Sequence, residues 1–136
     1  MGVLFKNADI TLYNKYYDKE NDVDRYQRVV IREVNWQGKR NATVGDKGLN
    51  RDDSILIFID KIPGYVSPKR FAKLTNEERL NYFTFGVNDI IVKGESDFEI
   101  TGIRPNSITD LENNFDDVVN ILGVQEWSGH WEVECK

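Results

Sequence analysis

Short runs in which apolar and polar residues alternate recur along this chain of 136 residues, and alternation of this kind predicts β-strands. Together with apolar runs, this pattern predicts strands at residues 9–14, 26–36, 54–59, 118–124 and 130–135. The second should be the longest strand, and its alternation slips around Val29–Ile31, which indicates burial on both faces or a bulge. The continuously apolar run SILIFI predicts a central strand.

A plain hairpin is predicted over Phe85–Ile103, FGVNDIIVKGESDFEITGI. A short apolar strand is followed by a turn at Gly94–Asp97. A second strand would then point Phe98 and Ile100 inward. No side chain in this stretch stands in a catalytic or ligand-binding pattern, so the hairpin is interpreted as part of the structural framework.

Turn-forming and charged residues separate the predicted strands. Residues 15–24 predict a polar loop or a long hairpin tip, and residues 48–53 predict a second polar loop. Gln37–Lys39 should form a turn, after which Asn41–Val44 would pair back.

Helical spacing replaces alternation only at residues 67–83. Ser67-Pro68 fits a helix start, and Thr75 followed by Glu78 fits a capping box, so one kinked helix or two short ones would satisfy the pattern. One further helical turn is expected at Ile108–Leu111. The whole pattern predicts one domain, residues 1–136, that is mainly β. It would be a small β-barrel or sandwich of six to eight strands with one short helical insertion and long polar loops.

The chain is acidic, with 23 Asp and Glu against 18 Lys and Arg and a formal net charge of −5. This balance argues against a protein that grips nucleic acid, because binding phosphates depends on Lys and Arg. It leaves open a protein that lines a path for DNA without holding it. No apolar run approaches the roughly 18 residues of a membrane span, and no signal peptide is expected at the start. A single cysteine indicates a reducing site of synthesis.

One loop carries four carboxylates at every second position, a spacing similar to that of an EF-hand calcium loop. They are Asp18, Glu20, Asp22 and Asp24. That motif requires glycine at its sixth position and glutamate at its twelfth, where this chain has Val23 and Val29. The loop is therefore interpreted as a solvated tip, and no metal site is expected.

Other chemistry finds little support in the sequence. His130 is the only histidine, and Cys135 lies close to it, but neither stands in a pattern typical of nucleophilic or zinc sites. Glycine-rich phosphate-binding loops are missing. No catalytic residue and no cofactor is therefore expected. A carboxylate-based enzyme, such as a small hydrolase acting on cell wall, stays open and would require two buried carboxylates with raised pKa values in one cleft.

A domain that works by contact is the favoured interpretation, because long polar loops surround a small β core. Aromatic side chains near the first loop are typical anchors of protein–protein contacts. The candidate interface residues are Tyr16, Tyr17, Asp18, Glu20, Asp22, Asp24, Trp36, Lys47, Asn50 and Tyr65. A single-strand-binding module of the OB type is an alternative, in which Trp36 and Tyr65 would act with the basic groups Lys39-Arg40 and Lys69-Arg70-Lys73.

Several segments resemble a family of short prophage proteins from Gram-positive bacteria, encoded among head and head–tail joining genes. The similar segments are ADITLYNKYYDKENDVDRYQRVVIREVNWQGK, DDSILIFI, VNDIIVKGESDFEITGI and HWEVECK. A looser similarity links the hairpin to head-closure (stopper) and head–tail adaptor proteins of long-tailed phages. The positions that carry it are Asp89, Ile90, Gly94, Phe98, Ile100 and Ile103.

These resemblances imply a structural protein of the virion, assembled in the bacterial cytoplasm, that forms a homo-oligomeric ring between portal and tail. Its partners would be further copies of itself, portal or adaptor proteins and tail proteins. DNA would pass without sequence-specific binding, and no membrane would be involved. The loops at 16–24 or 45–53 are expected to reach the channel or a neighbouring ring. A tail terminator or another tail-associated ring protein is the nearest alternative.

Overall fold

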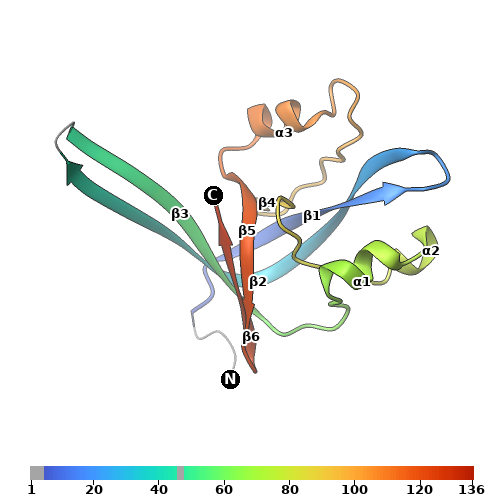
Figure 1. The fold of residues 1–136 in the computed structure, drawn as a ribbon, viewed down its shortest axis with the longest axis horizontal. Helices are drawn as coiled ribbons and strands as arrows, with labels where there is room; N and C mark the ends of the chain where they lie inside the picture. Colours follow the sequence, from blue (N-terminus) through green and yellow to red (C-terminus); the bar gives the residue numbers. More distant parts are fainter. Residues whose placement is uncertain (1–4, 46–47) are drawn as a thin grey trace.

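The computed structural model describes residues 5–45 and 48–136, and for residues 39–45 and 48–53 it describes the backbone alone. Six strands and three short helices follow one another along the chain (Figure 1). Their bounds are β1 Ala8–Asp18, β2 Val23–Gly45, β3 Gly48–Asp60, α1 Pro68–Lys73, α2 Asn76–Arg79, β4 Ile90–Lys93, α3 Ile108–Asn114, β5 Val118–Glu126 and β6 His130–Cys135. The expectation of a mainly β fold is confirmed.

The strands form a closed antiparallel barrel in the order β1-β2-β3-β6-β5-β4. Closure comes from β1 and β4, which pair from Ile10 opposite Lys93 to Tyr13 opposite Ile90. The continuous apolar run at 54–59 lies in β3, between β2 and β6, and is central as predicted. Every strand of the wall therefore has a neighbour on both sides, and its backbone groups are paired within the barrel.

A β-bulge bends β2 close to where the alternation slips. Ala8 pairs with Val34 and Ile10 with Ile31, so the single residue Asp9 faces two residues of β2. One of these is Glu33, which has a φ of 58° and donates its backbone N–H to the Asp9 carboxylate at 2.9 Å. The extra residue restores the inward orientation of Val34, which is fully buried.

The turn predicted at Gln37–Lys39 and the loop predicted at 48–53 are both wrong. β2 continues for 23 residues, and it pairs with β3 without interruption from Asn35 opposite Phe58 to Gly45 opposite Gly48. Gly38 lies inside this ladder, opposite Ile55. The local preference of Gly for turns is weak, and the continuing pairs with an apolar partner strand outweigh it.

The excess length of β2 and β3 leaves the barrel wall. Within β3, only Ile55–Asp60 pair with β6. Within β2, pairing with β1 ends at Val34. Among the strand pairings that the structure describes, residues 39–45 and 48–54 pair only with each other. They form a two-stranded ribbon, here called the distal ribbon, which projects away from the barrel (Figure 1).

Two apolar clusters hold the described part of the chain together. The main cluster fills the barrel, and its buried members are Ile10, Leu12, Ile31, Val34, Trp36, Ile57, Ile59, Phe83, Phe85, Ile91, Ile121, Trp131, Val133 and Cys135. Trp131, Val133 and Cys135 point inward from β6, as its alternation predicts. The second cluster lies on the opposite face of β1 and β4 and consists of Tyr13, Ile90, Val92, Ile100 and Leu111.

The second strand of the predicted 85–103 hairpin does not form. Burial alternates as expected, with Ile100 buried between the exposed Glu99 and Thr101. However, β4 already pairs with β1 on one side and β5 on the other, so it has no edge for a further strand. The segment packs across the outer face of β1 and β4 instead.

Side chains of β1 hold this segment in place. The Tyr13 hydroxyl donates to the Phe98 carbonyl at 2.7 Å. The Thr11 hydroxyl accepts from the Ser96 backbone N–H at 2.8 Å. Polar contacts from β1 thus replace the strand pairing that the sequence predicted.

The helical predictions are confirmed. Residues 67–83 form two short helices rather than one kinked helix. Ser67 caps α1 with Pro in its first turn, and Thr75 with Glu78 forms the capping box of α2. The helical turn at 108–111 is real and continues as α3 to Asn114.

Substitution of Tyr13 by Phe tests the contacts that replace the second strand of the hairpin. The variant removes the hydroxyl from the Phe98 carbonyl and from Ser96 Oγ, which lies 3.0 Å away. We expect the free energy of unfolding to fall by about 1–3 kcal/mol, since buried acceptors lose their donor. Urea denaturation measures this change. Tyr82→Phe is the control, since no hydrogen bond of the Tyr82 hydroxyl is found in the described residues. Equal losses of unfolding free energy in Tyr13→Phe and Tyr82→Phe would contradict the stabilising role assigned to the Tyr13 hydroxyl.

Candidate functional site

The end of the β1–β2 hairpin, where most of the predicted interface residues fall, is built around Asp18. This carboxylate is 3% exposed. It accepts side-chain hydrogen bonds from Asn21 at 2.8 Å, from Arg25 at 2.7 Å and from Asn76 of α2 at 3.0 Å. The bonds from Asn21, Arg25 and Asn76 lower the pKa of Asp18 far below its usual range. Asp18 therefore organises the hairpin and docks α2 on it.

The other three carboxylates of the hairpin do not converge with Asp18. Asp24 pairs with Lys15 at 3.7 Å, and Asp22 accepts a hydrogen bond from the Tyr17 hydroxyl. Glu20 is exposed. Among the described residues, no three His, Cys, Asp or Glu side chains gather as a metal ion would require. Three of the four acidic residues thus lie on the solvent side, as the interpretation of a solvated tip requires.

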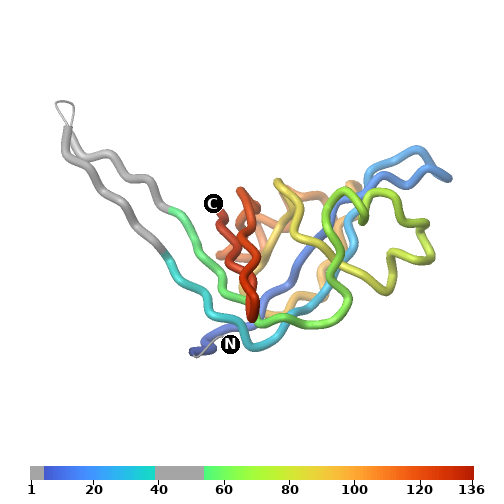
Figure 2. Tube along the Cα trace, turned by 60° about the horizontal axis from the view of Figure 1, so that its bottom comes forward, coloured from blue at the N-terminus to red at the C-terminus, as the bar shows by residue number. Residues whose placement is uncertain are grey.

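Arg79 locks the helical insertion against the hairpin. Its side chain is 2% exposed. Its guanidinium lies 4.4 Å from the ring centroid of Tyr16 and 5.3 Å from that of Phe71. It also donates to the Leu74 carbonyl at 2.6 Å. A buried cation between two rings thus joins β1 to both helices, and Figure 2 shows α1 and α2 running beside the end of this hairpin.

A groove of about 370 Å³ opens between this hairpin, α1 and the segment before β4. It is lined by Lys15, Tyr16, Tyr17, Lys19, Asp24, Pro68, Phe71, Ala72, Thr84, Gly86, Val87 and Asp89. Tyr17 and Val87 remain 48% and 65% exposed. The structure thus brings Tyr16, Tyr17 and Asp24 to one apolar groove, here called the hairpin groove. Exposed aromatic and aliphatic side chains in a concave surface are typical of a protein-binding site.

Asp89, in the wall of the hairpin groove, is a buried carboxylate. This position entered the sequence-based expectations only through the hairpin resemblance, which did not predict its burial. It accepts hydrogen bonds from the Asn14 side chain at 2.8 Å and from the backbone N–H of Gly86 at 3.0 Å and Lys15 at 3.1 Å. Burial raises the pKa of Asp89, although these hydrogen bonds oppose the shift. A side chain at Gly86 would place a Cβ only 2.9 Å from the Asp89 carboxylate. The contact therefore requires glycine.

Asn14, which donates to Asp89, is the residue from which this buried network could have been predicted. It stands at the third inward position of DITLYN, after Ile10 and Leu12, where an apolar side chain is normal. It is fully buried. It accepts from the Thr84 N–H at 3.1 Å and donates to the Thr84 carbonyl at 2.7 Å. A polar residue on an inward position could thus have indicated a buried hydrogen-bond network.

The remaining predicted residues lie elsewhere. Trp36 is 8% exposed and belongs to the main cluster. Tyr65 is half-buried and packs at 4.9 Å, between ring centroids, against Trp131. Trp36 thus packs inside the barrel core and Tyr65 packs against it, so the two rings do not form a shared exposed stacking surface of the kind an OB-type module would use. Lys47 lies outside the described residues, and so does the side chain of Asn50.

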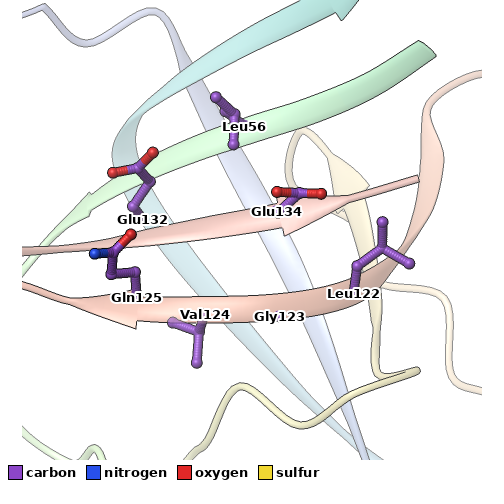
Figure 3. Close-up of a pocket in the computed structure, with 7 residues that line it drawn as sticks. All are labelled: Leu56, Leu122, Gly123, Val124, Gln125, Glu132 and Glu134. Carbon is purple, nitrogen blue, oxygen red and sulfur yellow. The ribbon is translucent and has the colours of Figure 1, made fainter. Parts of the chain in front are cut away.

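A second groove, of about 280 Å³, crosses the outer surface of β3, β6 and β5 (Figure 3). Leu56 comes from β3, Glu132 and Glu134 from β6, and Leu122 with Gln125 from β5. Gly123 and Val124 complete the lining. The outward residues of β6 make this groove acidic, and it is called the β6 groove below. No sequence pattern singled it out, because alternating glutamates on a strand are typical of any solvated face.

A model described as a family of unknown function (DUF6751) matches residues 5–136. The chain belongs to this family. No curated protein and no solved structure matches it. The match to this DUF6751 chain runs from the residues just before β1 to the end of the sequence, and so includes both grooves and the distal ribbon.

His130 and Cys135 occupy different surroundings in this DUF6751 chain. His130 stacks on Trp127, with ring centroids 6.3 Å apart, on the outer surface of the barrel. Cys135 is buried inside the barrel, where burial raises its pKa to about 12. One side chain thus faces outward and the other inward. Within residues 5–45 and 48–136, no helix is long and apolar enough to cross a bilayer.

Asp18→Asn tests the role of this carboxylate in the hairpin of the DUF6751 chain. The folded-state pKa of Asp18 lies below the ordinary value of 3.8, so the unfolded chain binds more protons. Its stabilising effect is therefore present above about pH 4 and is lost as the pH falls further. We expect the variant to be less stable than the wild type at neutral pH, and the gap to narrow below about pH 4.

Urea denaturation over a pH series measures both curves. Glu20→Gln is the matched control, because it removes one charge from the same hairpin without touching the bonds of Asp18, and its curve should follow the wild type. A gap that stays constant from neutral to acid pH would contradict the assignment.

Proposed function

We propose that this protein is a structural component of a phage particle that forms a ring in the head–tail connector, as a head-closure (stopper) or adaptor protein. The proposal joins two independent lines of support. One is the resemblance to short prophage proteins encoded among head–tail joining genes, carried by segments such as DITLYNKY and HWEVECK. The other is the shape of the fold, in which projections for contact extend from a small closed barrel.

The observation that carries the proposal is the opposite placement of two projections. The distal ribbon leaves one side of the barrel, and the β1–β2 hairpin with α1 and α2 leaves the other (Figure 1). A copy with different surfaces on its two sides can bind the next copy head to tail. Such heterologous contacts close into a ring when the rotation between copies permits it.

The distal ribbon has the properties of a segment that is completed by a partner. Isolated two-stranded hairpins are marginally stable in water. Residues 39–45 and 48–54 pair with each other and with no further described strand, so both outer edges present backbone groups for additional contacts. In the proposed ring, a neighbouring copy or an adjacent ring of portal or tail proteins covers them.

The charge of the chain fits the same role. A formal charge of −5 repels the phosphate backbone of DNA. A ring with this charge lets the genome slide through its channel without sticking, since tight binding requires phosphates to be neutralised by Lys and Arg. The protein would accordingly be found in the virion after assembly in the bacterial cytoplasm.

Deletion of the gene from an inducible prophage tests the proposed function. We expect DNA-filled heads that lose their DNA and do not join tails, because the exit of the portal is left open. Electron microscopy of the lysate distinguishes the outcomes. Overlong tails on intact heads would favour the tail-terminator alternative, and normal tailed particles would overturn both.

Shortening the distal ribbon tests the surface that carries the proposal. Residues 41–52 are removed and Arg40 is joined to Asp53 by an Asn-Gly turn, which suits a two-residue hairpin connection. The β2–β3 pairs from Asn35 opposite Phe58 to Arg40 opposite Asp53 remain. The β3–β6 pairs at 55–60 remain as well, so the barrel should fold. We expect thermal unfolding close to that of the full chain but failure to restore tail joining to the deleted prophage. Full restoration by the shortened chain would show that the ribbon is dispensable.

A further inference from the structure

The outer face of β6 presents two carboxylates beside exposed apolar surface. Glu132 and Glu134 alternate with the buried Trp131, Val133 and Cys135, so both point away from the barrel interior. In the β6 groove they lie between Leu56 and Leu122, and Leu122 is 46% exposed (Figure 3). A concave surface that is partly apolar and carries two negative charges fits a cationic partner.

Helix α1 presents the opposite charge. Its six residues include Lys69, Arg70 and Lys73 and no acidic residue. All three side chains are exposed, and none forms a salt bridge within the described residues. The apolar side of α1 is already used, since Phe71 is buried against Arg79. The cations of α1 are therefore available to a partner.

The two charged surfaces lie on opposite sides of the barrel. α1 lies against the end of β1, because Phe71 and Ala72 share the hairpin groove with Tyr16 and Tyr17. In the closed order β1-β2-β3-β6-β5-β4, β6 is three strands away from β1 in either direction. One chain therefore cannot bring its own α1 to its own β6 groove, but two copies placed side by side can.

We propose that α1 of one copy binds in the β6 groove of the next copy. The contact is heterologous, since different surfaces of the two copies meet. It rests on the proposed ring and names the contact through which neighbouring copies are held. Lys69 and Lys73 face Glu132 and Glu134, and the aliphatic stems of the lysines cover Leu122.

The spacing of the charges agrees with this contact. Lys69 and Lys73 are four residues apart on a helix, where Cβ atoms lie about 5–6 Å from each other. Glu132 and Glu134 are two residues apart on one face of a strand, a separation of about 7 Å at about 3.3 Å per residue. Two lysines can thus approach two glutamates at the same time. A chain with a net charge of −5 would otherwise repel its own copies, so such local complementarity is needed for self-association.

Paired charge reversals in the full-length chain test the contact. One variant carries K69E and K73E, and the other carries E132K and E134K. Self-association of the wild type is measured by sedimentation up to millimolar concentration in low salt, and it should weaken as salt is raised to about 1 M, where the Debye length is about 3 Å. We expect each variant alone to associate at least about tenfold more weakly than the wild type, because like charges then meet.

Mixing the two variants in equal amounts should restore association, because each reversed surface then meets its complement. The matched control is E112K with D116K, which changes two exposed acidic residues outside the groove and gives the same net charge as E132K with E134K. It should associate at least as strongly as the wild type does, because its net charge of about −1 lowers the repulsion between copies. Thermal unfolding of all variants confirms that the barrel is intact.

The results separate this contact from the proposed function. A wild type that stays monomeric, reversals that act no more strongly than the control, or a mixture without restored association would each overturn the contact, even if deletion of the gene blocks tail joining. Restored association in the mixture would support the contact, even if deletion of the gene leaves tails normal and the connector role fails.

Discussion

Closure of the barrel through β4 is the constraint on which the rest of the structure depends. β4 has only four residues, so it spans about 13 Å at about 3.3 Å per residue. It must nevertheless pair with β1 on one side and β5 on the other to close the wall. The barrel wall at β4 is therefore short along the strand direction, whereas β2 is 23 residues long. Residues of β2 and β3 that exceed the wall have no strand to join except each other, and they leave the barrel as the distal ribbon.

The same constraint explains the buried polar contacts beside β4. A strand of four residues offers few ladder hydrogen bonds, and side chains of β1 supply additional contacts at both of its ends. Asn14 binds the Asp89 carboxylate directly before β4, and Thr11 binds Gly94 and Ser96 directly after it. Because such groups are costly to bury without partners, the network also fixes the register of β1 against β4.

Both candidate surfaces follow from this architecture. The end of β1 continues past the wall, and the helical insertion packs there through Arg79 and Asp18, which leaves the cations of α1 exposed. On the other side of the barrel, β6 is covered from inside by the main cluster and stays open outside. One chain thus carries an exposed cationic helix and an acidic groove that face away from each other. This asymmetry is what a head-to-tail assembly requires.

Patterns of a few residues were enough to predict much of the fold. Alternation placed Trp131, Val133 and Cys135 on the inner face of β6, and the capping signals of Ser67 and Thr75 placed α1 and α2, because these features depend on neighbours within one turn or one strand. The turn at Gln37–Lys39 and the strand at 98–101 failed for a shared reason. Whether a residue continues a strand depends on a free edge of a partner strand. β3 has such an edge opposite Gly38. Both edges of β4 are already paired, so none is left for Phe98.

The sequence by itself determined the mainly β class, the inward faces of the strands, the acidic charge and the tyrosine-rich hairpin. Only the tertiary structure decided which side chains meet across the chain. Asp18 stands among four similar carboxylates, yet it alone is buried against Asn76, which lies 58 residues away. Burial and hydrogen bonding arise from contacts between distant segments, and barrel closure selects those contacts. A local pattern can therefore name a candidate residue, but it cannot say whether that residue lies on the surface or in the framework.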